Sequence, residues 1–347
     1  HFDQGTLFID TLTNKSGLEL LSDFPKFSMH QPGYLAYGNS PVNFLIDPFD
    51  INYLTDLALK NVTFSGNLYL DGVETNLDGI LSFDHTNNLA SSLISDSLIY
   101  LYKNIISFKG KLNLSSNGLF AVGDFQSDHM IFKSSRMELN SGNLRGPVFE
   151  LRNGTKFAQT PFMVDDAVLN YFPYEETFLL KNSLDKITMY SKFDFIGDLY
   201  FDGENLNGSG ELLSDYYLID ASHHYFSNNN IMSADAVLNL NNNVNYLHAN
   251  GVTIEQTLNT DSMFVYKHNH DFELPLLDYS VDFDFFILDV QEKYISFQNN
   301  DFSQEGSLFS KKYGKKGFTY DALDVTYSLI SNELCVESVF PLSLKKF

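Results

Sequence analysis

The sequence predicts an all-β fold arranged as a β-solenoid, a β-helix-like stack of short strands. Three observations lead to this prediction. A glycine-punctuated segment recurs along the chain, Phe and Tyr number 32 and 20 while Trp is absent, and turn signals recur about every 8–12 residues. Phe and Tyr favour the pleated, half-buried surface of a strand. An elongated twisted β-sandwich and an open β-groove are the alternative architectures.

The recurring segment has a constant order of features. Its clearest copy, F-I-G-D-L-Y-F-D-G-E-N-L-N-G-S-G at 195–210, has a strand with alternating apolar residues, an Asp-Gly turn and a second glycine, and a serine-rich strand follows. Self-similarity of this kind is typical of a solenoid or array, in which each unit buries its apolar edge on the next. We therefore expect one elongated β-repeat body over 1–347, as part of a longer chain. The repeat copies lie near 64–101, 108–140 and 195–240.

The remaining segments fit the same class. Proline and glycine punctuate 25–41, which predicts turns between short strands. The apolar run at 54–59 is expected to be buried. In 168–180, Pro173 stops any helix, and the surrounding aromatic residues should fill a corner of the core. The segment 281–290 alternates acidic and aromatic residues and is read as strand.

Composition limits the partners. A formal net charge of −22 predicts a solvated acidic surface that would repel a phosphate backbone, so nucleic acid is not an expected partner. No apolar run reaches the roughly 18–20 residues that span a bilayer. The single cysteine, Cys335, has apolar neighbours and is predicted to be a small buried side chain. Because the chain begins at His1, we expect a processed product or a piece of something longer.

The sequence contains few candidates for chemistry. The best metal candidates are His223-His224 and the segment 268–271, in which His268 and His270 would share one face of a strand and could hold a metal with Asp271 as a third ligand. Exposed histidines in an asparagine-rich neighbourhood are the simpler interpretation. Acidic pairs such as Asp165 and Asp166 are read as a solvated edge. Because no nucleophile elbow, zinc-protease motif or phosphate-binding loop occurs, we predict no catalytic residue, no cofactor and no enzymatic activity.

Four runs of the sequence resemble segments of a known group of proteins. They are F-P-Y-E-E-T-F, D-L-Y-F-D-G-E-N-L-N-G-S-G, S-A-D-A-V-L-N-L and V-D-F-D-F. Over roughly 60–340 the chain resembles the large, mostly uncharacterised, repetitive envelope and surface proteins of Bacteroidetes. The resemblance implies export to the cell envelope, in the periplasm or on the cell surface, and a long β-body. It also implies O-glycosylation in the short motifs D-T-L, D-S-L and D-S-M, at Thr11, Ser97 and Ser262.

Three functions follow as hypotheses. The first is a non-enzymatic structural or interaction component of an envelope or surface assembly, with other envelope proteins as partners. The second is a periplasmic lipid-transport groove similar to the TamB/AsmA group, which would need an interior open to lipid. The third is a polysaccharide-binding or polysaccharide-cleaving β-helix. It would need exposed aromatic residues beside a carboxylate pair, and Tyr216, Tyr217 and Tyr225 are its candidates, with at least one of the first two facing inward.

Overall fold

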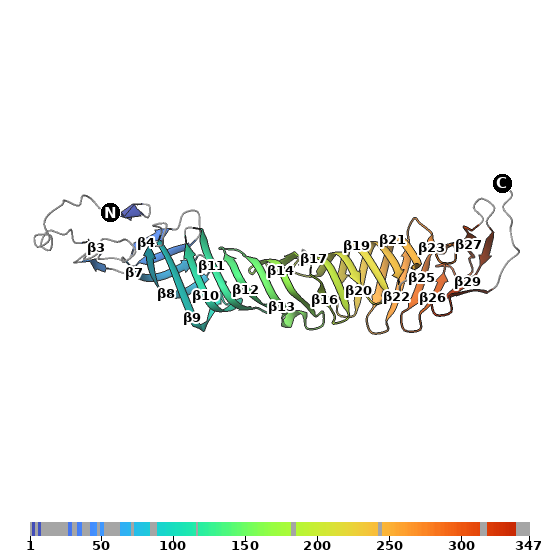
Figure 1. Ribbon diagram of the computed structural model, residues 1–347, viewed down its shortest axis with the longest axis horizontal. Helices are drawn as coiled ribbons and strands as arrows, with labels where there is room; N and C mark the ends of the chain where they lie inside the picture. Colours follow the sequence, from blue (N-terminus) through green and yellow to red (C-terminus); the bar gives the residue numbers. More distant parts are fainter. Residues whose placement is uncertain are drawn as a thin grey trace, which may run out of the picture. The chain divides into compact units, whose positions relative to one another are not determined.

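The computed structural model is all-β (Figure 1). The structure describes residues 2–3, 6–7, 27–29, 33–36, 42–46, 49–51, 63–70, 73–83, 89–115, 117–181, 185–241, 245–312 and 318–337. Within these ranges the one helical element is the 3-10 turn η2 (Thr155–Phe157). The strands are β1 (Phe2–Asp3), β2 (Thr6–Leu7), β3 (Phe27–Met29), β4 (Gly33–Ala36), β5 (Val42–Ile46), β6 (Phe49–Ile51), β7 (Thr63–Leu70), β8 (Val73–Phe83), β9 (Leu89–Leu101), β10 (Ile106–Ser115), β11 (Gly118–Gln126), β12 (Met130–Leu139), β13 (Leu144–Asn153), β14 (Phe162–Phe172), β15 (Thr177–Lys181), β16 (Ile187–Met189), β17 (Phe193–Phe201), β18 (Leu206–Leu213), β19 (Tyr217–Phe226), β20 (Asn230–Asn241), β21 (Asn245–Thr257), β22 (Ser262–Lys267), β23 (Phe272–Leu274), β24 (Tyr279–Asp282), β25 (Phe285–Asp289), β26 (Tyr294–Gln298), β27 (Gly306–Ser310), β28 (Thr319–Ala322), β29 (Asp324–Ser328) and β30 (Glu333–Glu337).

The strands pair antiparallel, mostly with their neighbours in the chain. The hairpins β7–β8, β10–β11 and β17–β18 occupy the three repeat copies, and β18–β19, β19–β20 and β20–β21 continue the ladder. Stacked coils of a β-helix would instead pair in parallel. The pairing thus confirms the predicted all-β class but not the β-helix-like stack.

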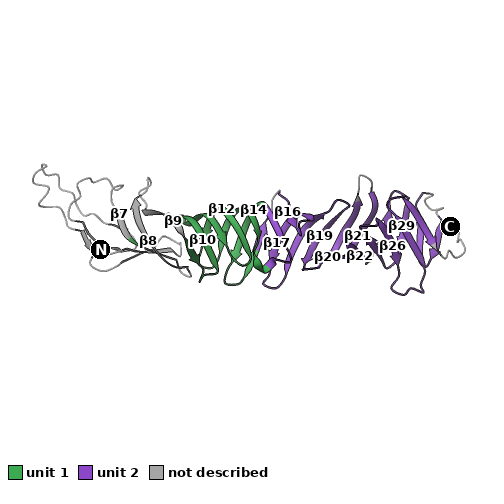
Figure 2. Ribbon diagram, turned by 90° about the horizontal axis from the view of Figure 1, so that it is seen from below, with its two compact units in different colours: residues 1–156, 165–178 green, residues 157–164, 179–347 purple. Residues whose placement is uncertain are grey.

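The chain divides into two compact units (Figure 2). Unit 1 comprises 1–156 and 165–178, and unit 2 comprises 157–164 and 179–347. The expected buried run at 54–59 lies outside the described residues.

The strands of the repeats are longer than the sequence predicts, because a bulge in mid-strand looks like a strand end in the sequence. In β19, Tyr217, Ile219 and Ala221 are buried, the next two residues are exposed, and burial resumes at His224 and Phe226. Two consecutive outward residues shift the alternation, so both halves of the strand bury side chains. The prediction of short strands is therefore wrong here, since β19 has 10 residues and β20 has 12.

A contact across the interior shows that a bent strand folds over its own core. The Tyr217 hydroxyl, in the first half of β19, accepts a hydrogen bond from Gln256 Nε2 in the second half of β21. Both residues are buried. The two halves of the bent ladder in unit 2 therefore face each other.

Each repeat hairpin places two glycines opposite each other at the bend. The pairs are Gly66–Gly79, Gly110–Gly123 and Gly197–Gly210, with the same sequence separation in all three. A Cβ on Gly110 would lie 2.2 Å from the Val122 carbonyl oxygen, and one on Gly197 would lie 2.1 Å from the Ser209 carbonyl oxygen. Their φ angles of 154° and 157° are also ones that L side chains rarely adopt. Only glycine permits this backbone approach.

The Asp-Gly turn of the third copy is confirmed. Asp202 Oδ1 accepts the N–H groups of Glu204 at 3.0 Å and Asn205 at 2.7 Å, and Gly203 has a φ of 103°. These backbone hydrogen bonds lower the pKa of the Asp202 carboxyl. Asp at the start of a turn and Gly inside it are thus each fixed by their local chemistry.

Beyond β21 the hairpins alternate between two ladders. One runs β21–β22–β25–β26–β29–β30 and the other β21–β23–β24–β27–β28. Their apolar faces meet, since the ring of Phe272 in β23 lies 4.9 Å from that of Phe286 in β25 and 5.9 Å from that of Phe297 in β26. The predicted strand at 281–290 is broken at the buried Phe283, where the chain passes from one ladder to the other.

Two other predictions concern corners and edges. No helix forms around Pro173, as expected, but the aromatic residues near it fill the core only in part, since Tyr171 is buried and Tyr174 is exposed. Cys335 is exposed, so the prediction of a buried thiol is wrong. Strand alternation explains the error, because Leu334 and Val336 share the opposite face of β30.

We expect an alanine at a paired glycine to destabilise the fold. Gly110→Ala should lower the free energy of unfolding by about 1–3 kcal/mol, because its Cβ would overlap a carbonyl oxygen of β11. Gly142→Ala is the matched control, since nothing lies within 4 Å of its Cβ, and it should change stability by less than about 0.5 kcal/mol. Urea unfolding of both variants measures the difference, and equal midpoints would contradict the proposed role of the pair.

Candidate functional site

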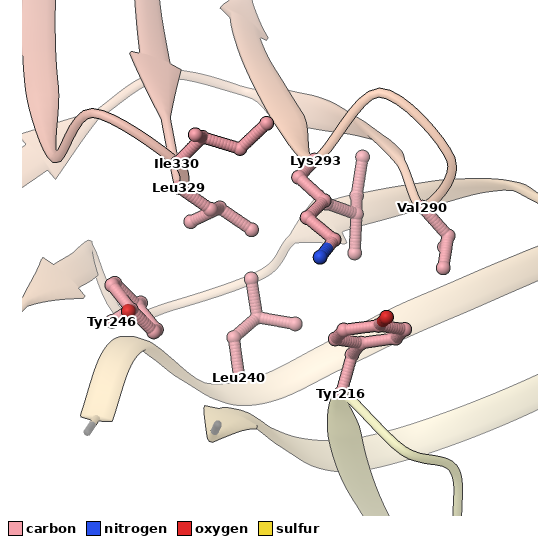
Figure 3. A pocket seen from close by; sticks show the side chains of 8 residues that line it. Tyr216, Leu240, Tyr246, Val290, Lys293, Leu329 and Ile330 are labelled. Atoms are coloured by element: carbon pink, nitrogen blue, oxygen red, sulfur yellow. The ribbon is translucent and has the colours of Figure 1, made fainter. Parts of the chain in front are cut away.

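A pocket in unit 2 is the candidate binding site (Figure 3). Its cavity volume is about 170 Å³. It is formed where the ends of several strands and their turns meet, so residues distant in the sequence line it. The lining side chains are Tyr216, Leu240, Tyr246, Leu288, Val290, Lys293, Leu329 and Ile330.

Lys293 supplies the one charge among these lining side chains. Its Nζ lies 4.8 Å from the centre of the Tyr216 ring, a cation–π contact. Figure 3 shows the ammonium directed toward the side of the pocket where Leu240 and Tyr216 lie. Among the described residues no carboxylate forms an ion pair with it, whereas Lys192 and Lys311 in the same unit are each paired.

Backbone hydrogen bonds hold the two turns that frame the pocket. The Leu329 N–H donates to the Lys293 carbonyl at 2.9 Å, and the Val290 N–H donates to the Asp261 carbonyl at 3.1 Å. Lys293 itself has a φ of 55° at the end of the turn between β25 and β26. The Lys293 side chain therefore extends from a backbone that these hydrogen bonds hold in place.

A buried histidine lies at the glycine bend of β18. The His224 ring has no exposed surface, and its Nε2 is 2.8 Å from the Gly210 carbonyl oxygen while Nδ1 is 2.8 Å from Ser233 Oγ. A carbonyl only accepts, so Nε2 donates and Nδ1 accepts from the hydroxyl. Burial is the main cause that lowers the pKa of His224. The neutral ring thus satisfies the Gly210 carbonyl where the register between β18 and β19 shifts.

A second histidine joins three turns of unit 1. Nδ1 of the buried His129 is 3.1 Å from the Tyr171 hydroxyl, and its Nε2 is 3.9 Å from Glu176 Oε2. Lys156 Nζ is 2.7 Å from the same carboxylate, and this hydrogen bond lowers the pKa of Glu176. Burial, followed by the Lys156 charge, lowers the pKa of His129. This arrangement fits a structural link between turns.

The predicted metal ligands lie in a bend, not on a strand. His268 and His270 fall between β22 and β23, so strand alternation does not place them on one face. His268 Nε2 is 2.8 Å from Thr253 Oγ1, and Asp271 Oδ1 is 3.5 Å from Lys267 Nζ. Within the described ranges no three His, Cys, Asp or Glu side chains gather as metal ligands would. Metal binding at these residues stays a prediction.

The three predicted glycosylation residues have different settings. Thr11 lies outside the described residues, and Ser97 lies in β9. Ser262 begins β22, between Asp261, which pairs with Lys192, and the fully buried Met263. O-glycosylation at these positions stays a prediction.

The three tyrosines proposed for glycan contact lie in different settings. Tyr217 is buried, which confirms that at least one of Tyr216 and Tyr217 faces inward. Tyr216 lines the pocket, and Tyr225 is exposed on β19. They do not form a row on one face. The pocket and the burial of His129 and His224 were not predicted, because the partners of these residues lie on strands that only the tertiary pairing brings together.

Comparisons with family models, curated proteins and solved structures gave no match to this chain. In the described residues there is no helix of the length and apolarity that a membrane crossing requires.

We expect His224 to make stability depend on pH. Its folded-state pKa is below the unfolded value of 6.5, so the unfolded state binds more protons as the pH falls through 6.5. The contribution of His224 to the free energy of unfolding is therefore complete above pH 6.5 and decreases as the pH falls below that value. When urea unfolding is measured at decreasing pH, His224→Gln should lose less stability below pH 6.5 than the unchanged chain does.

The neighbouring exposed His223 is the matched control. His223→Gln should keep the full pH dependence, while His129 contributes equally in all three proteins. Identical pH profiles for His224→Gln and the unchanged chain would contradict this role of His224.

Proposed function

We propose that this chain is a non-enzymatic structural and interaction component of an exported envelope or surface assembly. The observation that carries the proposal is the bent hairpin itself. Each repeat hairpin pairs two glycines, in β10–β11 and β17–β18 the strand halves on both sides of the pair bury apolar side chains, and the hairpins pair with the following or preceding strands through their backbones. Such units extend a scaffold without a catalytic centre. We further propose that they form one elongated repetitive body.

The interior of each unit supports a scaffold more than a lipid groove. In unit 1 the rings of Phe108 and Phe125 lie 4.7 Å apart, and those of Phe125 and Phe132 are stacked at 4.9 Å. In unit 2 Phe283, Phe286 and Phe297 pack together. Side chains occupy the space that an open groove would offer to lipid, so the TamB/AsmA-like alternative has less support.

The outer face offers surface for protein contact. Tyr225 and Met232 are cross-strand neighbours on β19 and β20, and both are exposed. Exposed aromatic and methionine side chains are enriched in protein interfaces. The envelope location rests on the resemblance to Bacteroidetes surface proteins. Glycan binding is less supported, because the candidate tyrosines do not share a face.

Native isolation at low detergent, followed by mass spectrometry, tests the proposal. We expect one or more proteins in fixed stoichiometry with the chain, retained through a second purification step and absent from a mock isolation without the tagged chain. A compact monomer that turns over a defined substrate would contradict the proposal. Co-purified lipid or glycan without protein would favour one of the alternatives instead.

A further inference from the structure

We propose that the pocket framed by Tyr216, Lys293 and Ile330 binds a small apolar carboxylate. The carboxylate would pair with the Lys293 ammonium, and the hydrocarbon part would lie against Leu240 and Leu288. This goes beyond the scaffold function proposed above and does not depend on it.

The walls of the pocket match a short hydrocarbon. Leu240 and Leu288 form its buried side, and Ile330, 74% exposed, stands at the rim. The cavity of about 170 Å³ is close in size to an engineered apolar cavity of about 150 Å³ that holds benzene. The pocket therefore fits a ring or chain of about six carbons.

The charge of the pocket selects an anion. Lys293 has no carboxylate partner among the described residues, although the chain has a net charge of −22. One ammonium beside apolar walls suits a singly charged carboxylate, whereas phosphate sites normally gather several donors. An apolar amine would be repelled by the same group.

The site is preorganised. The Leu329 N–H donates to the Lys293 carbonyl, and β26 pairs with β29 through Tyr294 and Ser328. These bonds fix both turns before any ligand arrives. Binding therefore needs little ordering of the backbone.

The chain contains a matched contact without this pocket. Lys103 in unit 1 also ends over a tyrosine ring, with its Nζ 5.8 Å from the centre of Tyr174, and its φ of 54° is close to the 55° of Lys293. Lys103 is not among the residues that line the pocket. Lys103→Met thus controls for the loss of a turn lysine and of its cation–π contact.

The experiment is a titration of the full chain, labelled at Ile, Leu and Val methyl groups, with hexanoate, hexanol and hexylamine at constant ionic strength. We expect hexanoate to give saturable shifts in the methyl signals of Ile330 and Leu240. Hexanol should bind about two- to fivefold more weakly, as for the loss of one partly exposed ion pair, and hexylamine should not bind.

The variants separate the charge from the walls. Lys293→Met should reduce hexanoate affinity to that of hexanol and leave hexanol binding unchanged, while Lys103→Met should bind both as the unchanged chain does. The absence of saturable shifts, equal affinity for hexanoate and hexanol, or full hexanoate affinity in Lys293→Met would overturn the proposal. If Lys293→Met unfolds, the comparison of the three ligands on the unchanged chain still tests whether the pocket prefers a carboxylate.

Discussion

The close backbone approach of the paired glycines is the constraint on which the repeat hairpins depend. In the strands that carry the paired glycines the alternation of buried residues continues through the bend, as at Phe108 and Leu112 on either side of Gly110, and the two backbones of the hairpin come together there. The shift of alternation by one residue lies in neighbouring strands such as β19. At Gly110 and Gly123 a carbonyl oxygen of the partner strand occupies the place of a Cβ. The aromatic interiors on either side of the bend depend on this contact, because without it the two halves could not both turn inward.

The bend also leaves a buried backbone carbonyl in need of a hydrogen-bond donor, and a nearby side chain provides one. Where the register shifts between β18 and β19, the Gly210 carbonyl is bonded by the imidazole of His224, which is buried against Phe195 and Phe226. A buried acceptor without a partner would cost about 1–3 kcal/mol. The histidine provides the missing donor and apolar ring surface together, so a polar side chain is compatible with an aromatic core.

Turns perform a different task from strands in this protein. The strands supply rigid backbone, while the turns that end in left-handed residues, such as Asp261, Lys293 and Asn332, set the direction of side chains at the strand ends. Asn and Asp adopt this conformation more readily than other non-glycine residues. The pocket lies among such turns, as binding sites on rigid scaffolds commonly do.

The sequence by itself determined the all-β class, the Asp202-Gly203 turn and the inward facing of at least one of Tyr216 and Tyr217, because each follows from local propensity and strand alternation. Tertiary structure alone decided that the strands are long and bent and that hairpins beyond β21 alternate between two ladders. It also brought Tyr216, Lys293 and Ile330 to one pocket and His224 to the Gly210 carbonyl. These features depend on pairings between distant segments. A bulge changes which residues of a strand point inward, but in the sequence it is visible only as two consecutive residues that interrupt the alternation of apolar and polar residues.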